Sequence, residues 1–290
     1  MFGITFRNTL KNLLRSPTCI FCLAVVLIVA VYSVFQGMYG YYLPELKEII
    51  YDTDPRYVLD YKTAVQHVTN ALSEILAYSI PIYTVICTAV ILTRDYGDGF
   101  YEIEHSYGIN RLAYLCGRLC ALCCCLFAVT FAVYAFSYYL FVFTRGGIEG
   151  MTTAQLILDS VPRIVRMAFA KGLTNVMFYV CLTYMVGALC KSGIVAAAGG
   201  MVYAIFCYMS ELLLSATLKK IGATAFFDWF HPLPQKLSDY LYYYDTEWFD
   251  ELCTARGASL SSALACIGFL AGTALVCGII AYLRIRKRNR

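Results

Sequence analysis

The sequence predicts an all-α membrane protein that crosses the bilayer six times, with the N- and C-termini on the same side. Apolar residues make up 60% of the chain and charged residues 14%, and the mean hydropathy is +0.64. These values lie outside the range of ordinary soluble domains. Alternating strand patterns are absent, and a backbone in lipid must pair its polar groups internally, so the spanning element is the helix.

Six apolar runs are each long enough to cross a hydrocarbon core of about 30 Å, because a helix rises about 1.5 Å per residue. They cover residues 18–42, 72–92, 118–143, 167–190, 193–214 and 260–283. We expect one transmembrane domain over residues 1–290. The short segments 1–17, 93–117, 191–192 and 284–290 are denser in Lys and Arg than the longer segments between them, so both termini are predicted to be cytoplasmic in a multi-pass cell-membrane protein.

Residues 1–17 are predicted to form a helix that lies in the membrane interface. Apolar and basic side chains alternate with helical spacing and fall on two different faces. The apolar face comprises Phe6, Leu10, Leu13 and Leu14, and the basic face Arg7, Lys11 and Arg15. Ser16-Pro17 is expected to end this helix. The alternative is a basic flank that only sets topology, and the two interpretations are compatible.

Two other segments have distinctive compositions. Residues 215–259, on the predicted outer side, contain "FFDWFHPLPQKLSDYLYYYDTEWF". Aromatic rings with polar edges settle at the headgroup level, which favours short helices dipping into the outer leaflet, with a substrate-contacting vestibule as the alternative. The run "CGRLCALCCC" at residues 116–125 is interpreted as small buried side chains of a membrane helix, not as a metal site.

Motifs for catalysis and nucleotide binding do not occur in the chain. "EIEHS" brings Glu102, Glu104 and His105 together, but a zinc motif needs a second His three or four residues away. Neither G-x-S-x-G nor G-x-x-x-x-G-K-[ST] is present. We therefore expect no catalytic, cofactor-binding or metal-binding residue, no enzyme activity and no nucleic-acid partner.

Small residues within the spans are predicted to let helices approach closely. Gly268 and Gly272 form G-x-x-x-G in the last run, and small residues also gather at Gly193, Ala197, Gly199 and Gly200 in the fifth.

The charged segment "TRDYGDGFYEIEHSYGINR", residues 93–111, separates the second and third runs on the cytoplasmic side. Phe100, Ile103 and Tyr107 recur at helical spacing beside Glu102 and Glu104, which indicates a short amphipathic helix presented to another protein. A loop that only turned the chain could be a few residues long. A solvated turn is the alternative interpretation.

This segment resembles the cytoplasmic coupling segment of ABC-2 type transporter permeases. The matching positions are Asp95, Gly99-Phe100, Glu102, "SYGINR" with Gly108 and Arg111, and Gly117-Arg118. Phe100 stands where the family often has Thr, and Arg118 where it often has Lys. The basic N-terminal helix, the six spans and the aromatic outer segment are similar as well.

The resemblance implies the membrane subunit of an ATP-driven exporter. A separate ABC ATP-binding subunit would hold ATP and Mg²⁺, and the chain would form a homodimer or a heterodimer with a second permease. The residues implied in coupling are Asp95, Asp98, Gly99, Phe100, Glu102, Tyr107, Gly108 and Arg111. We expect Asp98 and Glu102 to meet basic residues of the ATPase, and Phe100 and Tyr107 to fill an apolar groove on it. Largely uncharged spans favour a hydrophobic or amphipathic substrate.

Two other functions are compatible with the six runs. A non-transporting membrane anchor or sensor would keep the spans but needs no coupling segment. A membrane-embedded enzyme would need paired His or carboxylate groups at matching depth, and the sequence offers only Glu211 as a well-embedded carboxylate.

Overall fold

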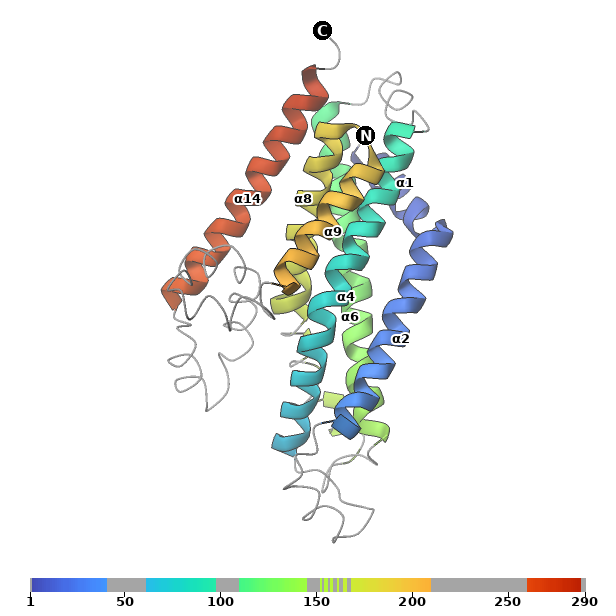
Figure 1. Ribbon diagram of the computed structural model, residues 1–290, viewed down its shortest axis with the longest axis vertical. Coiled ribbons are helices and arrows are strands. Elements are labelled where there is room, and N and C mark those ends of the chain that lie inside the picture. Colours follow the sequence, from blue (N-terminus) through green and yellow to red (C-terminus); the bar gives the residue numbers. More distant parts are fainter. Residues whose placement is uncertain are drawn as a thin grey trace.

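The computed structural model describes residues 2–40, 61–97, 110–144, 168–209 and 260–287, together with scattered residues between 152 and 165. Within this part every regular element is helical, with seven α-helices, one π-helical segment and no strand, which confirms the predicted all-α class. The elements are α1 (Phe2–Arg15), α2 (Pro17–Gly40), α4 (Tyr61–Gly97), α6 (Arg111–Thr144), η1 (Ala168–Leu173), α8 (Thr174–Cys190), α9 (Gly193–Met209) and α14 (Leu260–Lys287) (Figure 1).

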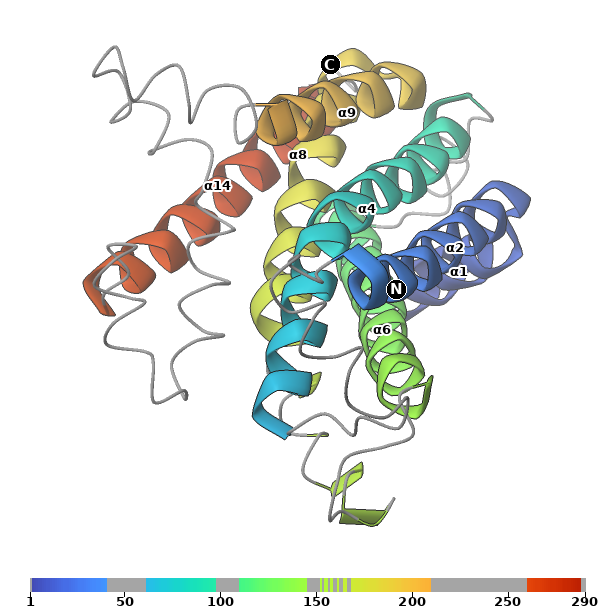
Figure 2. The ribbon, with the colours of Figure 1, turned by 60° about the horizontal axis from the view of Figure 1, so that its bottom comes forward.

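The six apolar runs correspond to six helical units in this order. α2, α4, α6, α9 and α14 each contain most or all of one run, and η1 continues directly into α8 to cover the fourth. The helices of the bundle run side by side, and consecutive units alternate in direction (Figure 1). α14 packs against α8. The end of α14 that carries its first residue lies away from the rest of the bundle (Figure 2).

Among the described residues, one helix is long and apolar enough by itself to cross a membrane, the stretch Leu112–Leu140 within α6. The pair Phe2–Arg15 and Pro17–Tyr32 meets the same requirement together, but its two helices bend by 62° at the break. Three further apolar helices, Asn175–Cys190, Gly193–Ile205 and Gly272–Arg284, are shorter. Among the described residues, the combination of membrane-crossing length and apolar composition is therefore met by fewer helices than the six that the sequence predicts.

Local capping explains where three of the helices begin. Ser16 separates α1 from α2, and its side-chain oxygen accepts a hydrogen bond from the Cys19 amide at 3.4 Å, with Pro17 at the first helical position. The Asn110 side chain accepts from the Leu112 amide at 3.0 Å at the start of α6. α8 ends at Cys190, and the residue after it, Lys191, has a left-handed backbone with φ 53°. Ser192 then caps α9, because its side-chain oxygen accepts from the Val195 amide.

One end of the bundle contains the helix ends from which the candidate site is built. α1, the start of α2, the end of α4, the start of α6, the turn between α8 and α9, and the end of α14 all lie there, at the top of Figure 1. We call it the α1 end. Because α1 and the last turn of α14 are both found at it, the two terminal helices of the described chain lie on the same side of the bundle.

Glycine allows close helix contacts at this end. At Gly193 of α9, an added Cβ would collide with the Thr93 side chain and with backbone atoms of Thr93 and Ala89 in α4. At Gly187 of α8, it would lie 2.5 Å from Leu92. The small residues predicted at Gly193, Gly199 and Gly200 therefore do lie where α9 meets its neighbours, whereas an added Cβ at Gly268 or Gly272 would meet nothing within 4 Å in the described structure.

The outer faces of the helices are strongly apolar. Large side chains that are half or more exposed include Ile20, Phe21, Ile28 and Tyr32 on α2, Ile194, Val202 and Ile205 on α9, and Leu275, Val276 and Leu283 on α14. Polar side chains such as Thr84, Thr130, Ser137 and Thr183 are instead fully buried. The bundle thus places apolar groups outside and several polar groups inside.

One sequence expectation about which residues are buried was wrong. Cys116, Cys120 and Cys124 recur at four-residue spacing on α6 and are exposed, so they are not buried core residues. In α1 the buried side chains are Thr5, Thr9 and Leu13, whereas Leu14 is 61% exposed and lies outside the face that packs on the bundle. At this contact α6 offers α1 a glycine and a buried arginine, which favour small hydroxyl side chains over bulky apolar ones.

Candidate functional site

The predicted coupling residues are divided between described and undescribed parts of the chain. Asp95 lies in the last turn of α4, and Arg111 is the first residue of α6, with its side chain outside the described residues. Residues 98–109 lie outside the described part altogether, and they include Asp98, Gly99, Phe100, Glu102, Tyr107 and Gly108. The candidate site is therefore built from the two helix ends that flank this segment.

Asp95 and Arg118 form a buried ion pair between these helix ends. The Nη2 atom of Arg118 donates to Oδ1 of Asp95 at 2.6 Å, and the two side chains are 1% and 3% exposed, respectively. A buried charge needs a partner at good hydrogen-bonding geometry, since the protein interior cannot replace its hydration. The pair thus ties the last turn of α4 to the second turn of α6.

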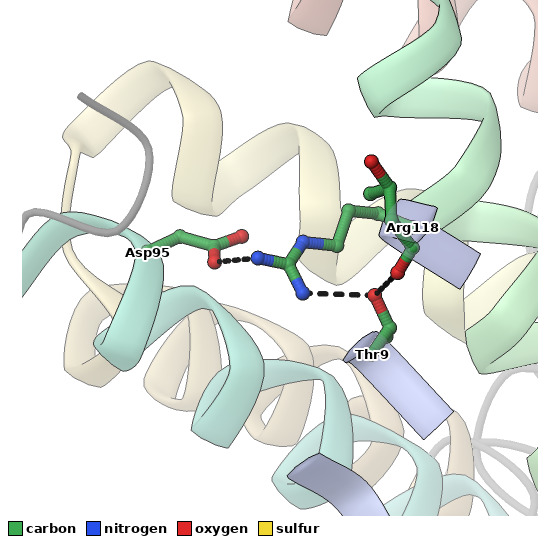
Figure 3. A network of polar contacts seen from close by, with 4 residues as sticks. Thr9, Asp95 and Arg118 are labelled. Atoms are coloured by element: carbon green, nitrogen blue, oxygen red, sulfur yellow. Dashed lines mark hydrogen bonds and ion pairs between the residues drawn. The ribbon is translucent and has the colours of Figure 1, made fainter. Parts of the chain in front are cut away.

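The same guanidinium also reaches α1. Nη1 of Arg118 donates to the hydroxyl oxygen of Thr9 at 2.8 Å, and that hydroxyl donates to the Thr5 carbonyl at 2.7 Å. Figure 3 shows Arg118 lying between Asp95 on one side and Thr9 on the other. Because guanidinium nitrogens diverge in a rigid plane, one arginine can join two other helices at once.

Two neighbouring contacts hold this arginine and α1 in place. The Arg118 guanidinium carbon lies 5.1 Å from the ring centroid of Tyr114, one turn earlier on α6, which is within range of a cation–π interaction. Beside Arg118, a Cβ on Gly117 would lie 3.0 Å from Cβ of Thr5 and 3.2 Å from the carbonyl oxygen of Phe2. Glycine at this position therefore lets the backbone of α1 approach α6 closely enough for Thr9 to reach Arg118.

The burial of Asp95 changes what the sequence suggested about that residue. A position on a surface presented to another protein would leave its carboxylate accessible, but the carboxylate is buried and bound by Arg118. Asp95 is therefore a structural link at the base of the segment, not one of its exposed contacts. The coupling roles of Asp98, Gly99, Phe100, Glu102, Tyr107, Gly108 and Arg111 stay predictions.

The resemblance to the permease family identifies Arg118 only as an arginine at a position where lysine is frequent. A signal for its role was present, because an arginine at the edge of a long apolar run needs an acidic partner, and Asp95 is the last acidic residue of the preceding helix. The sequence gives no comparable indication for Thr9. A threonine hydroxyl can hydrogen-bond to many kinds of partner, and Thr9 lies 109 residues from Arg118 in sequence.

The basic side chains that the structure describes lie at the same end. The basic residues whose side chains are described are Arg7, Lys11, Arg15, Arg94, Arg118, Lys191 and Arg284, and all belong to helix ends that meet at the α1 end. Apart from Arg118, each is exposed or half-buried. This end of the described bundle is therefore positively charged on its surface.

The described residues offer no set of side chains that could bind a metal ion. No group of three or more His, Cys, Asp or Glu side chains that could hold a metal ion occurs among the described residues. What the arrangement can do is mechanical: three helix ends are joined through one buried arginine.

Comparison with known protein families finds a match over most of the chain. A family model described as "Protein of unknown function (DUF2705)" matches residues 51–290. No curated protein and no solved structure matches the chain.

Proposed function

The chain belongs to the DUF2705 family, proteins of unknown function, and from that starting point we propose that it is the membrane-spanning permease subunit of an ATP-driven ABC exporter. The observation that carries the proposal is the Asp95–Arg118–Thr9 link, which joins three helix ends at the base of the charged segment 98–109. A segment that receives force from another protein needs a stiff connection to the helices it moves.

Membrane insertion of six helical units is the first part of the proposal. The exposed apolar side chains on α2, α9 and α14 would be costly in water but are suited to lipid. The 28 residues of α14 exceed the length needed to cross a core of about 30 Å. The six residues of η1 continue into the 17 of α8, so this unit is long enough as well.

Orientation follows from the charge of the α1 end. Basic residues that flank membrane helices are retained on the cytoplasmic side. The exposed cations of α1, Lys191 and Arg284 lie at the α1 end, so this end faces the cytoplasm in our proposal and both termini lie on that side. The segment 98–109, bounded by α4 and α6 at the same end, is then accessible to a cytoplasmic ATPase.

Coupling would work by rigid-body motion. When ATP closes the partner subunit, force on segment 98–109 reaches α4 and α6 together, because Arg118 binds Asp95 across the two helices. Thr9 adds α1 to the same moving unit. Helices that tilt as a group can switch access between the two sides of the membrane, which is a two-state change biased by a ligand on another chain.

The experiment is affinity purification of the full chain from its native membrane, followed by identification of any ATPase that accompanies it. The Glu102→Lys variant is expected to lose the ATPase or to lose transport-coupled ATP hydrolysis, because it reverses a charge in the coupling segment. Glu48→Lys, in the predicted outer segment 43–71, is the matched control and is expected to behave as the wild type.

The outcomes separate the possible functions. Full hydrolysis and export by the Glu102→Lys complex would refute the role of this segment. Recovery of the wild-type chain without an ATPase, and with no nucleotide-dependent change when candidate ATPases are added, would instead favour a non-transporting anchor or sensor.

A further inference from the structure

We propose that the outward face of α1 binds the headgroups of anionic phospholipids at the cytoplasmic surface of the membrane. This inference rests on the membrane insertion in the proposed function, but it requires neither an ATPase partner nor transport. It concerns the part of α1 that the Arg118 link does not use.

The two faces of α1 are chemically different. Thr5, Thr9 and Leu13 recur every four residues and are buried against the bundle. With about 100° between successive helical residues, Arg7, Lys11 and Arg15 recur on the opposite side and are all exposed. The contacts with α6 therefore fix which side of α1 points away from the bundle, and that side carries three cations in a row.

Among the residues that the structure describes, these cations have no acidic partner. α1 contains no Asp or Glu, and within the described part of the chain none of Arg7, Lys11 and Arg15 forms an ion pair. Three like charges at four-residue spacing repel one another and slightly destabilise a helix unless an anion lies over them. The face is therefore complementary in charge to a negatively charged surface.

Exposed apolar side chains on the same face of α1 indicate that its binding partner is a membrane surface. Ile4 is 59% exposed and Leu14 61% exposed, and both lie among the cations. At the start of α2, Ile20 and Phe21 are exposed as well. A face that mixes cations with exposed aliphatic side chains fits the level of the lipid headgroups, where the charges meet phosphate and the aliphatic groups meet the first carbons of the acyl chains.

The angle between α1 and α2 determines how deep the cationic face of α1 lies in the membrane. The two helices bend by 62° at Ser16. If α2 runs along the membrane normal, α1 lies closer to the membrane plane than to the normal, with its cations near the level at which α2 enters the bilayer. Buried contacts with Gly117 and Arg118 hold it at that angle.

The test measures lipid binding by the purified full-length chain, without any ATPase. The chain in a neutral detergent is titrated with phosphatidylglycerol or phosphatidylcholine, and native mass spectrometry records the fraction that carries bound lipid. The wild type is expected to prefer phosphatidylglycerol. In the variant Arg7→Gln/Lys11→Gln/Arg15→Gln that preference should fall on the order of tenfold or more, because each basic residue near an anionic surface adds to the attraction.

A matched control removes the same charge from the same end of the protein. Arg284→Gln/Arg286→Gln/Lys287→Gln, at the end of α14, is expected to keep the preference for phosphatidylglycerol. The charge-conserving variant Arg7→Lys/Lys11→Arg/Arg15→Lys should keep it too. If the triple α1 variant does not fold, the single variant Lys11→Gln serves, with an expected loss of a fewfold.

Two results would overturn the proposal. One is an unchanged preference in a folded α1 variant, and the other is an equal loss in the α14 control, which would assign the effect to total charge. Loss of ATPase recovery in the α1 variant with unchanged lipid preference would assign this face to a protein partner instead. Failure of the proposed transport function would leave the lipid preference intact, so the two proposals can be refuted separately.

Discussion

Replacing Asp95 by Asn should destabilise the protein strongly, because it leaves the Arg118 guanidinium buried without a counter-charge. Asn keeps the shape of the side chain but removes its charge. Arg118 is 1% exposed and Asp95 3%, so neither group can recover hydration by a small movement. Removing one partner of such a buried pair costs about 3–5 kcal/mol of unfolding free energy.

The expected change can be converted into a melting temperature. In a chain of 290 residues, about 1 kcal/mol corresponds to roughly 2 °C. Asp95→Asn should therefore lower the apparent melting temperature by about 6–10 °C. The measurement heats the detergent-solubilised protein and follows the fraction that stays monodisperse in size-exclusion chromatography.

A double-mutant cycle isolates the ion pair from other effects of the substitutions. Arg118→Met alone leaves the Asp95 carboxylate buried without its cation, so it should be as damaging as Asp95→Asn. The double variant Asp95→Leu/Arg118→Met removes both charges, and such replacements are often neutral or stabilising. We expect it to be more stable than either single variant and far more stable than the sum of their effects.

The control is Lys11→Gln, which removes an exposed charge from α1. Its unfolding free energy should change by no more than about 0.5 kcal/mol, or roughly 1 °C. The reasoning is refuted if Asp95→Asn melts at the wild-type temperature, or if the double variant shows the simple sum of the single losses.

The remaining predictions use the same heating assay, except the Gly117 variant and its Gly3 control, which are tested by proteolysis. Thr9→Val keeps the shape of the side chain but removes the acceptor for Arg118 Nη1, so we expect a loss of about 1–3 kcal/mol. Thr18→Val, at an exposed site on α2, should change little. Gly117→Val should separate α1 from α6, seen as faster proteolysis after Arg7, Lys11 and Arg15, whereas Gly3→Ala meets nothing within 4 Å and should leave cleavage unchanged. Gly193→Ala forces a Cβ into the backbone of α4 and should cost roughly 3 kcal/mol; a wild-type melting temperature would show that the two helices are less close than described. Gly278→Ala has open space and should be neutral or slightly stabilising.

The amino-acid sequence by itself determined where the helices lie. The run at 118–143 falls inside α6, and the break predicted at Ser16-Pro17 separates α1 from α2. These features could be predicted because length, apolar content and capping residues act within a few turns of one helix. The segment that the sequence marks as functional, residues 93–111, runs from the last turns of α4 to the first residue of α6.

Only the tertiary structure decided which polar groups meet. Asp95 and Arg118 are 23 residues apart, and their contact depends on how α4 and α6 are rotated about their axes, which no local pattern specifies. Thr9 joins them across 109 residues because Gly117 lets α1 pack closely. The same packing turned Arg7, Lys11 and Arg15 outward and left Leu14 exposed. Helix formation is governed by neighbours in sequence, whereas the faces that helices bury are governed by the shape and charge of the helices they pack against.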